Sequence, residues 1–519
     1  MARRRGADAR SAHRPAATTA AVGQKRGTAP SSQKPGAARR TWLIGAAAVV
    51  TTLLVYAGVA QAKRAFDAAR LPALPDLSVQ RAPITDHLRD ADRRARSDPA
   101  SAAAVGALCV AYHADLFYDQ AERCYARAEE LSAGEWRWTY YRALAHGERG
   151  GSEALASGMR RVVALAPDYG PAWLRLGEAE FKDGRYDRAE EAWRRASTSL
   201  EPDRTAPTGS PVHVASPPIA SYAALGLARV ALARGDADRA RQILEPVTSS
   251  APQFGPAFRL LGDSYARLGR TADAERAVDH TGRLAPYAPY ADPMVDTLAR
   301  ESRSSTFLLR QAQEADLTTN AAWAEYVMRR GLEFDPGNPD VVFTLGRILR
   351  TAGRNAEALD LFLRYQQLVP GDFQALGQIG NCLAALQRFA EAELFLRGAL
   401  EHLDDAPTHY NLGLVMALAG RPAEAVAEYE RALDRDASHV EARSNLAAML
   451  VRQGKLDRAS RQLERVLALD PENANAHTNL GLVLAQRGQV DRAAREFREA
   501  LRISPQLAQA REALATLRR

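Results

Sequence analysis

Cysteine is scarce in this chain of 519 residues, which contains only Cys109, Cys124 and Cys382. None of them belongs to a Cys-x-x-Cys pair, and no Cys-x-x-Cys-His run is present. The spacing therefore argues against a covalently attached c-type haem and against a cysteine-rich zinc site.

The sequence also lacks the short motifs that carry common chemistry: we find no P-loop, no G-x-G-x-x-G, no H-E-x-x-H, no G-x-S-x-G and no calcium loop. The ten histidines are scattered. His113, His146 and His409 have no carboxylate or second histidine at ligand spacing, so we expect them to have core or surface roles. We accordingly predict no catalytic residue, no metal and no cofactor.

Acidic residues are nearly absent from the start of the chain, since residues 1–40 hold eight Arg and two Lys against Asp8. The net charge of +7 therefore resides in this tail, and the rest of the chain is slightly acidic. The basic balance consequently gives no reason to expect a nucleic-acid partner. Large apolar side chains are also rare in this stretch, so residues 1–41 are predicted to be a disordered tail.

One long uncharged run follows the tail, over residues 42–59, with the sequence WLIGAAAVVTTLLVYAGV. Its length is close to that of a bilayer-spanning helix, and Trp42 and Tyr56 stand near its ends, where aromatic rings favour the interface. We predict a transmembrane helix over residues 42–60. The basic residues before it place the tail in the cytoplasm and the body on the extracytoplasmic (periplasmic) side.

Two other interpretations of this run stay open. Ala60-Gln61-Ala62 has the small-x-small form of a signal-peptidase site, and Arg39-Arg40 resembles part of a twin-arginine export signal. Cleavage at this site would export the same body without an anchor. A buried soluble helix is the remaining alternative.

The C-terminal third of the chain repeats with a period of 34 residues, most clearly at four sets of positions: Leu412, Leu446 and Leu480; Ala425, Ala459 and Ala493; Tyr429, Leu463 and Phe497; Ala432, Val466 and Ala500. Pro471 and Pro505 close two of these units, since proline cannot continue a helix. We expect the Leu to pack between the two helices of its own unit. The small Ala should let those helices approach, and the large side chain should fill the contact with the next unit.

This pattern resembles the tetratricopeptide repeat (TPR), whose unit is a helical hairpin of the same length. The resemblance implies an all-α, right-handed α-solenoid of about eleven repeats. We predict units at residues 102–134, 135–169, 170–203, 219–254, 255–288, 305–338, 339–372, 373–405, 406–439, 440–473 and 474–507. Residues 61–101 are expected to be a linker with a short helix, and residues 508–519 a capping helix.

The closing prolines reveal two interruptions of the period. Pro202 to Pro252 and Pro286 to Pro336 both span 50 residues, which is one repeat plus sixteen. The extra residues predict a loop near 204–218 and an irregular insertion over 289–304 that ends in a short helix-like stretch. These insertions divide the repeats into an N-terminal array over 102–288 and a C-terminal array over 305–507.

The resemblance implies a scaffold that binds other proteins or peptides in a concave groove lined by the first helix of each repeat. The alternative is an accessory subunit of an envelope enzyme or secretion system that captures client peptides. Membrane-anchored bacterial TPR proteins have a similar arrangement of one span and a long array. The oligomeric state is open.

One set of groove residues is a candidate partner-binding site. Asn411, Asn445 and Asn479 occupy the same repeat position, and Gln378 occupies it one unit earlier. Stacking of the repeats would place these carboxamides in a row able to bind a peptide backbone. Such a row resembles the asparagine ladder of the sugar transferase that glycosylates proteins. The simpler alternative is ordinary repeat surface.

Cys109 and Cys124 fall on opposite helices of the first repeat, at heights mirrored about its turn. Facing positions on packed helices can meet disulfide geometry, and an extracytoplasmic location would permit the bond. The alternative is two small core residues. Cys382 is expected in the core.

Overall fold

The computed structural model describes residues 36–199, 217–281, 290, 292–315 and 320–517. All regular elements within these residues are helices, α1 to α26. The chain divides into two compact units, residues 1–65 and 66–519. Most of the predicted tail and the loop near 204–218 lie outside the described residues.

Helix α1 is one continuous element over Gly36–Ala69. It therefore includes residues 36–41, which we expected in the tail, and residues 61–69, which we expected in the linker. Residues 61–69 are helical because they are rich in Ala, Lys, Arg and Gln, which favour helix. In the part of α1 whose side chains are described, residues 48–66 are exposed.

The predicted membrane span falls within α1. Among the described side chains, no helix contains an apolar stretch long enough to cross a bilayer. The side chains of residues 43–47, which belong to the predicted span, are not among those described. The transmembrane helix therefore stays a prediction.

Helix α2 (Ala82–Ser97) precedes the repeats and packs on α3. It is longer than the short linker helix expected here. Arg96 in its last turn donates to the carbonyl oxygens of Ala68 and Pro72, at 3.0 and 2.9 Å, so it holds the preceding segment against α2.

Eleven antiparallel hairpins make up most of the remaining described chain, one in each predicted unit. The first array has five, with helices α3 Ala102–Ala114, α4 Tyr118–Leu131, α5 Trp136–Glu148, α6 Ser152–Leu165, α7 Gly170–Lys182, α8 Tyr186–Ser197, α9 Ile219–Ala233, α10 Ala237–Ser250, α11 Gly255–Arg267 and α12 Thr271–Thr281.

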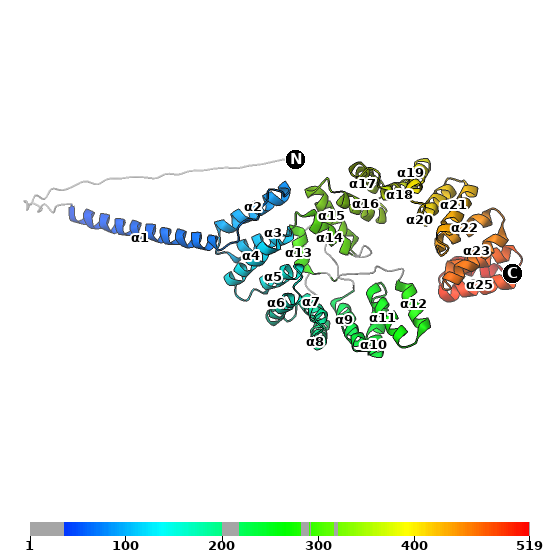
Figure 1. Ribbon diagram of the computed structural model, residues 1–519, viewed down its shortest axis with the longest axis horizontal. Coiled ribbons are helices and arrows are strands. Elements are labelled where there is room, and N and C mark those ends of the chain that lie inside the picture. Colours follow the sequence, from blue (N-terminus) through cyan, green and yellow to red (C-terminus); the bar gives the residue numbers. More distant parts are fainter. Residues whose placement is uncertain (1–35, 200–216, 282–289, 291, 316–319, 518–519) are drawn as a thin grey trace, which may run out of the picture. The chain divides into compact units, whose positions relative to one another are not determined.

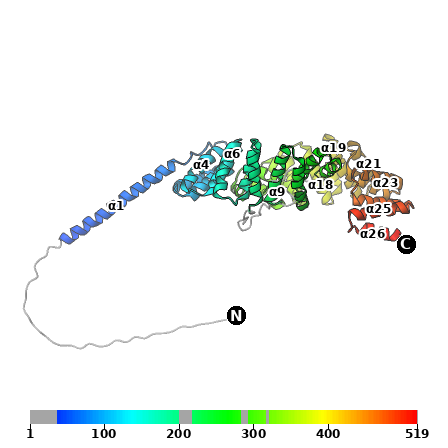
Figure 2. The same cartoon turned by 90° about the horizontal axis from the view of Figure 1, so that it is seen from below.

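The second array has six hairpins, with helices α14 Ser305–Glu314, α15 Ala321–Phe334, α16 Pro339–Thr351, α17 Asn355–Leu368, α18 Phe373–Ala385, α19 Phe389–His402, α20 Ala406–Leu418, α21 Pro422–Arg435, α22 Val440–Arg452, α23 Leu456–Leu469, α24 Ala474–Gln486 and α25 Val490–Ile503. Helix α26 (Ala508–Leu517) packs on α25. Consecutive hairpins stand side by side in the turned view of Figure 2.

The large side chains of several second helices also pack inside their own hairpins, which we did not expect. The Tyr429 ring lies against Gly413 of its own hairpin, where an added Cβ would come within 2.8 Å of the ring. Phe497 lies against Gly481 in the same way. The glycine thus lets the two helices of one hairpin close around a bulky ring. Contact with the next hairpin, as we expected, is made by Trp193, whose ring reaches Gly226.

The two arrays do not follow each other as one uninterrupted stack. The main buried cluster runs from α2–α8 through residues 294–315 into α15–α26, whereas residues 228–261 form a separate cluster. Residues 293–301, in the insertion whose end was expected to be helix-like, form helix α13 (Pro293–Glu301), which packs on α3 and α14 (Figure 1). The second array therefore begins beside the first repeats of the chain, whereas α9–α12 continue the stack of the first array from α8.

Candidate functional site

The predicted amide row lies on the first helices of four consecutive hairpins of the second array. Gln378 is in α18, Asn411 in α20, Asn445 in α22 and Asn479 in α24. Each residue directly precedes a buried aliphatic side chain that anchors its helix: Ile379, Leu412, Leu446 and Leu480. The first three amides are half-buried, and Asn479 is exposed.

Gln378 and Asn411 meet in one groove between α18 and α20, with a volume of about 350 Å³. We call it the amide groove; its lining residues are Phe373, Gln374, Gly377, Gln378, Asn381, Ala399, Leu403, Asp405, Pro407, Thr408 and Asn411. The Gln378 Oε1 atom is buried and has no hydrogen-bond partner within the described protein. A buried carbonyl oxygen without a donor is costly, so this atom is a site at which an incoming donor would be favourable.

Asn445 differs from its neighbours in the row. Its Nδ2 donates to the Tyr410 hydroxyl of the preceding hairpin at 3.3 Å. This amide therefore ties two hairpins together, and the row is not a uniform ladder. Asn445 and Asn479 are absent from the lining of the amide groove.

The two faces of the second array differ in charge. Helices α18, α20 and α24 contain no Asp, Glu, Lys or Arg. The charges lie mainly on the second helices, where arginines pair with glutamates of the preceding hairpin: Arg354–Glu325, Arg421–Glu393, Arg458–Glu430 and Arg492–Glu464. Exposed pairs contribute little stability, but they neutralise the outer face. The groove face is neutral because three of its first helices lack charged side chains.

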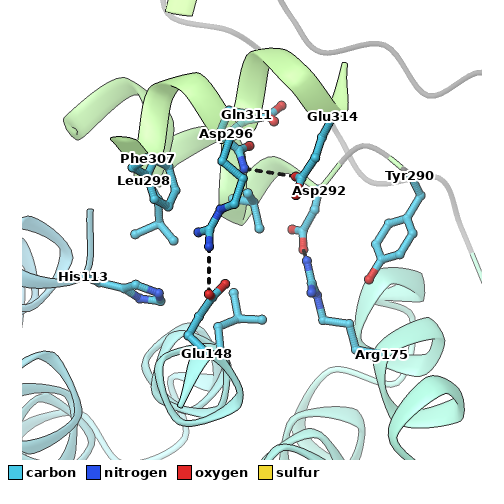
Figure 3. A pocket seen from close by; sticks show the side chains of 13 residues that line it. His113, Glu148, Arg175, Tyr290, Asp292, Asp296, Leu298, Phe307, Gln311 and Glu314 are labelled. Carbon is cyan, nitrogen blue, oxygen red and sulfur yellow. Dashed lines mark hydrogen bonds and ion pairs between the residues drawn. The ribbon is translucent and has the colours of Figure 1, made fainter. Parts of the chain in front are cut away.

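A second cavity lies where α13 and α14 meet the first array (Figure 3). We call it the junction pocket; its volume is about 380 Å³, and its lining residues are His113, Leu144, Glu148, Arg175, Tyr290, Asp292, Val295, Asp296, Leu298, Phe307, Arg310, Gln311 and Glu314. Its charged groups largely neutralise one another, since Arg310 pairs with Glu148 at 2.9 Å and Arg175 with Asp292 at 3.0 Å. The pocket could not be predicted from the sequence, because its walls come from distant parts of the chain.

Asp292 is the most heavily bonded of these residues. Its carboxylate, almost fully buried, accepts hydrogen bonds from the Tyr140 hydroxyl, from the Tyr169 hydroxyl at 2.8 Å and from Arg175. It also accepts from the Met294 backbone nitrogen at 3.0 Å, as the N-cap of α13. Burial is the main cause that raises the pKa of Tyr140 well above its usual value, so this phenol keeps the proton that it donates.

His113 is fully buried in α3, with its Nδ1 3.4 Å from the Tyr125 hydroxyl. Burial, reinforced by the charges of Arg310 and Arg175, lowers the pKa of His113 to about 3. The imidazole is therefore neutral at physiological pH, and its role is packing.

This histidine makes stability depend on pH. Between the usual histidine pKa of 6.5 and the folded value of about 3, the unfolded chain binds a proton that the folded chain does not. The free energy of unfolding should fall with decreasing pH below about 6.5, by up to about 1.4 kcal/mol per pH unit. Denaturant titrations at pH 7.0, 6.0 and 5.0 should show this slope in the wild type and a smaller one in His113→Gln. Equal slopes in both chains would contradict the assignment.

Other histidines have carboxylate partners that the sequence spacing did not suggest. His409 lies between Glu428 (2.7 Å from Nδ1) and Asp404 (2.8 Å from Nε2). His477 contacts Glu496 in the same way, at 2.7 Å. Our expectation of no carboxylate at ligand spacing was therefore wrong for His409. It was also wrong for His146, whose Nδ1 lies 3.0 Å from Glu122.

The missed signal was a sequence separation of 19 between His409 and Glu428, which recurs two repeats later between His477 and Glu496. This separation places both groups on facing helices of one hairpin. Within the described residues, no group of three or more His, Cys, Asp or Glu is arranged to hold a metal ion.

Cys109 and Cys124 are joined by a disulfide between α3 and α4, with their Cα atoms 5.2 Å apart. Both sulfurs are buried in the first hairpin. Cys382 is a buried free thiol in α18, and burial raises its pKa to about 11, so it stays protonated.

Known protein families contain the same helical repeat as this chain. A tetratricopeptide-repeat family model matches residues 152–202, 225–289, 320–373, 343–410 and 445–508, and a second such model matches residues 404–472. A curated relative, the cytochrome c-type biogenesis protein CycH of Rhizobium meliloti, is 31% identical over 140 residues. That match covers 26% of this chain and only 32% of the relative, about a third of its length.

Solved structures of similar architecture include YrrB, described as a TPR protein with an unusual peptide-binding site. It is 23% identical, with a TM-score of 0.31, and covers 36% of this chain and 96% of its own. The Cut9–Hcn1 complex of APC/C is 14% identical, with a TM-score of 0.38, and covers 85% of this chain and 94% of its own. The family models together match more than half of the chain, and helical hairpins occupy every repeat that they match. The chain therefore belongs to the tetratricopeptide-repeat family.

Proposed function

We propose that this protein is a scaffold that binds segments of other proteins in the amide groove and along the neighbouring first helices of the second array. The observation that carries the proposal is the lining of that groove. It places Gln378 and Asn411 on one concave surface and leaves the Gln378 Oε1 atom without a donor. Tetratricopeptide repeats bind peptides or other proteins, and the proposal assigns no reaction to this one.

The chemistry of the groove favours an extended, uncharged segment. Carboxamides both donate and accept, so they can pair with backbone N–H and C=O groups whatever the side chains of the partner are. Helices α18 and α20 carry no charged side chain. Asp405, the carboxylate in the lining, caps α20 by accepting from the Thr408 backbone nitrogen at 3.0 Å. Binding should therefore depend only weakly on salt concentration.

Gly377 allows a test that leaves the fold intact. It lies in the middle of α18 on the groove wall, and a Cβ added there would meet no atom within 4 Å. Gly377→Leu should keep or slightly raise stability, because glycine inside a helix is destabilising by about 0.5–1 kcal/mol. The leucine should nevertheless obstruct the groove.

Partners captured by crosslinked pull-down with the intact chain should be lost from Gly377→Leu and from the double variant Gln378→Ala with Asn411→Ala. The matched control is Gln367→Ala, which removes an exposed amide from the second helix α17. Retention of the same partners by all three variants would show that the groove is ordinary repeat surface.

The N-terminal run is the basis of a proposal about location. We propose that residues 42–60 form a membrane anchor with the repeats on the extracytoplasmic side. Apolar side chains with no protein cover support this, since Val50, Leu53, Leu54 and Val55 are 54–68% exposed. The intact chain should then resist alkaline carbonate extraction from membranes, and a chain beginning at residue 66 should be released. Release of both would leave the cleaved export signal as the better explanation.

A second candidate function is a client-capturing subunit in the assembly of other envelope proteins. The similarity of one segment to CycH, a cytochrome c-type biogenesis protein, favours it. A strain without this protein should then lose covalently bound haem in a peroxidase-stained gel. Normal c-type cytochrome levels would remove this candidate and leave the scaffold proposal untouched.

A further inference from the structure

The first helices of the first three hairpins, α3, α5 and α7, form a groove that already holds a helix of the same chain. That helix is α13, which packs on α3 although all of α4–α12 separates them in the sequence. It lies between the two arrays in Figure 1. The inner surface of the first array, where tetratricopeptide arrays hold partner helices, is thus occupied from within.

The N-terminal end of α13 is held through one carboxylate. Tyr140 from α5, Tyr169 directly before α7, and Arg175 from α7 all donate to Asp292. Arg175 also donates through Nε to the Tyr140 hydroxyl at 2.9 Å, so these two donors fix each other. Such a set selects a carboxylate, because all of its members present hydrogens to the same two oxygens.

The body and the C-terminal end of the segment are held by backbone contacts. The Tyr141 hydroxyl donates to the Met294 carbonyl at 3.1 Å. The Ser302 hydroxyl donates to the Ala114 carbonyl at 2.8 Å, and the Arg303 backbone nitrogen donates to Asp115 at 2.7 Å. The Met294 and Arg303 contacts use the backbone of the segment, so they would accept another segment of the same length with different side chains.

The groove is wider than the helix that it holds. The junction pocket of about 380 Å³ lies beside α13 and shares walls with this groove, since α3, α5 and α7 all contribute to its lining. Arg175 and Asp292 both line it (Figure 3). The present occupant therefore leaves room along the groove.

We propose that α3, α5 and α7 form a receptor for a short helix that begins with an aspartate, and that α13 is its built-in ligand. A partner segment of the same chemistry, a carboxylate at the helix start followed by an apolar helical face, binds there when α13 leaves. Tethering gives α13 a high effective concentration, so it excludes free segments until its own contacts are weakened. This groove is distinct from the amide groove, and the two can be tested independently.

The test uses the full chain and a peptide of residues 292–304, N-terminally acetylated and fluorescently labelled. Asp292→Asn weakens the built-in ligand while keeping a side chain that can cap α13. Fluorescence anisotropy should show that this variant binds the peptide at least about tenfold more tightly than the wild type, whose groove is filled. A peptide with Asn in place of Asp292 should bind the variant at least about tenfold more weakly, because it lacks the carboxylate.

Two further variants complete the design. Asp292→Asn combined with Arg175→Gln should lose the peptide, because the receptor then lacks its cation. Asp187→Asn, which changes an almost fully exposed carboxylate, should behave as the wild type does. If circular dichroism shows that Asp292→Asn does not fold, the Ser302→Ala variant takes its place in the experiment. That substitution weakens the opposite end of α13.

Failure of a folded Asp292→Asn or Ser302→Ala chain to bind the peptide would overturn the proposal and show that α13 is a permanent part of the core. Equal binding of the Asp and Asn peptides would also overturn it, because recognition would then not depend on the carboxylate.

Discussion

Replacement of Asp292 by alanine is expected to destabilise the contact between the two arrays by about 3–5 kcal/mol, the usual cost of removing one partner from a buried ion pair. The carboxylate is almost fully buried and pairs with Arg175, while Tyr140 and Tyr169 also donate to it. Alanine would leave three donors facing one another without an acceptor. It would also remove the N-cap of α13, which adds about 1 kcal/mol to the loss.

Hydrogen exchange is the appropriate measurement, because a chain of this size need not unfold in a single step. The amides of α13 should exchange through an opening that is about three to four orders of magnitude more populated in the variant than in the wild type. The amides of α20–α25 should be unchanged, since these helices do not contact Asp292.

The matched control is Asp187→Ala. Its carboxylate pairs with Arg234 but is 99% exposed, and exposed pairs contribute little to stability. Exchange in this variant should equal that of the wild type throughout. If Asp292→Ala and Asp187→Ala behave alike, the buried carboxylate does not hold the two arrays together.

Reduction of the Cys109–Cys124 disulfide is expected to destabilise the first hairpin by about 3 kcal/mol. The two cysteines are 15 residues apart, and closing a loop of that length restricts the unfolded chain by about this amount. The bond joins α3 to α4. His113 lies in α3 and Asp115 directly follows that helix. These two residues face the junction with α13 and α14. Loosening this hairpin should therefore also increase hydrogen exchange in α13.

Thermal unfolding with and without dithiothreitol checks this prediction. The wild type should unfold at a lower temperature in the reductant, whereas Cys109→Ser with Cys124→Ser should not respond. Cys382 does not complicate the comparison, because its thiol is buried and protonated. An unchanged melting curve for the reduced wild type would mean that packing alone holds the hairpin.

The hairpins could be predicted from the sequence because their determinants are local. Leu412, Ala425 and Tyr429 recur once in every repeat of the C-terminal third, and each contact that they make lies within one unit or between neighbours. Prolines at the ends of units mark where each hairpin stops, since they cannot continue a helix. Local order of this kind is visible in the period itself.

The amide row could be predicted only as a set of positions. Its residues share one place in the repeat, but their surroundings differ: Asn445 bonds to Tyr410, whereas Gln378 lines a groove with an unpaired oxygen. Side-chain contacts with neighbouring hairpins decide this difference, and those neighbours vary from unit to unit.

The sequence by itself determined the helical repeat, its family, the hairpin boundaries and the neutral first helices, because these depend on residues fewer than about 40 positions apart. Only the tertiary structure decided where α13 lies. Asp292 meets Arg175 across 117 residues and Tyr140 across 152, and no periodic signal links positions so far apart. The second array thus starts beside the first repeats, where the buried carboxylate of Asp292 meets its three donors and residues 294–315 join the main buried cluster.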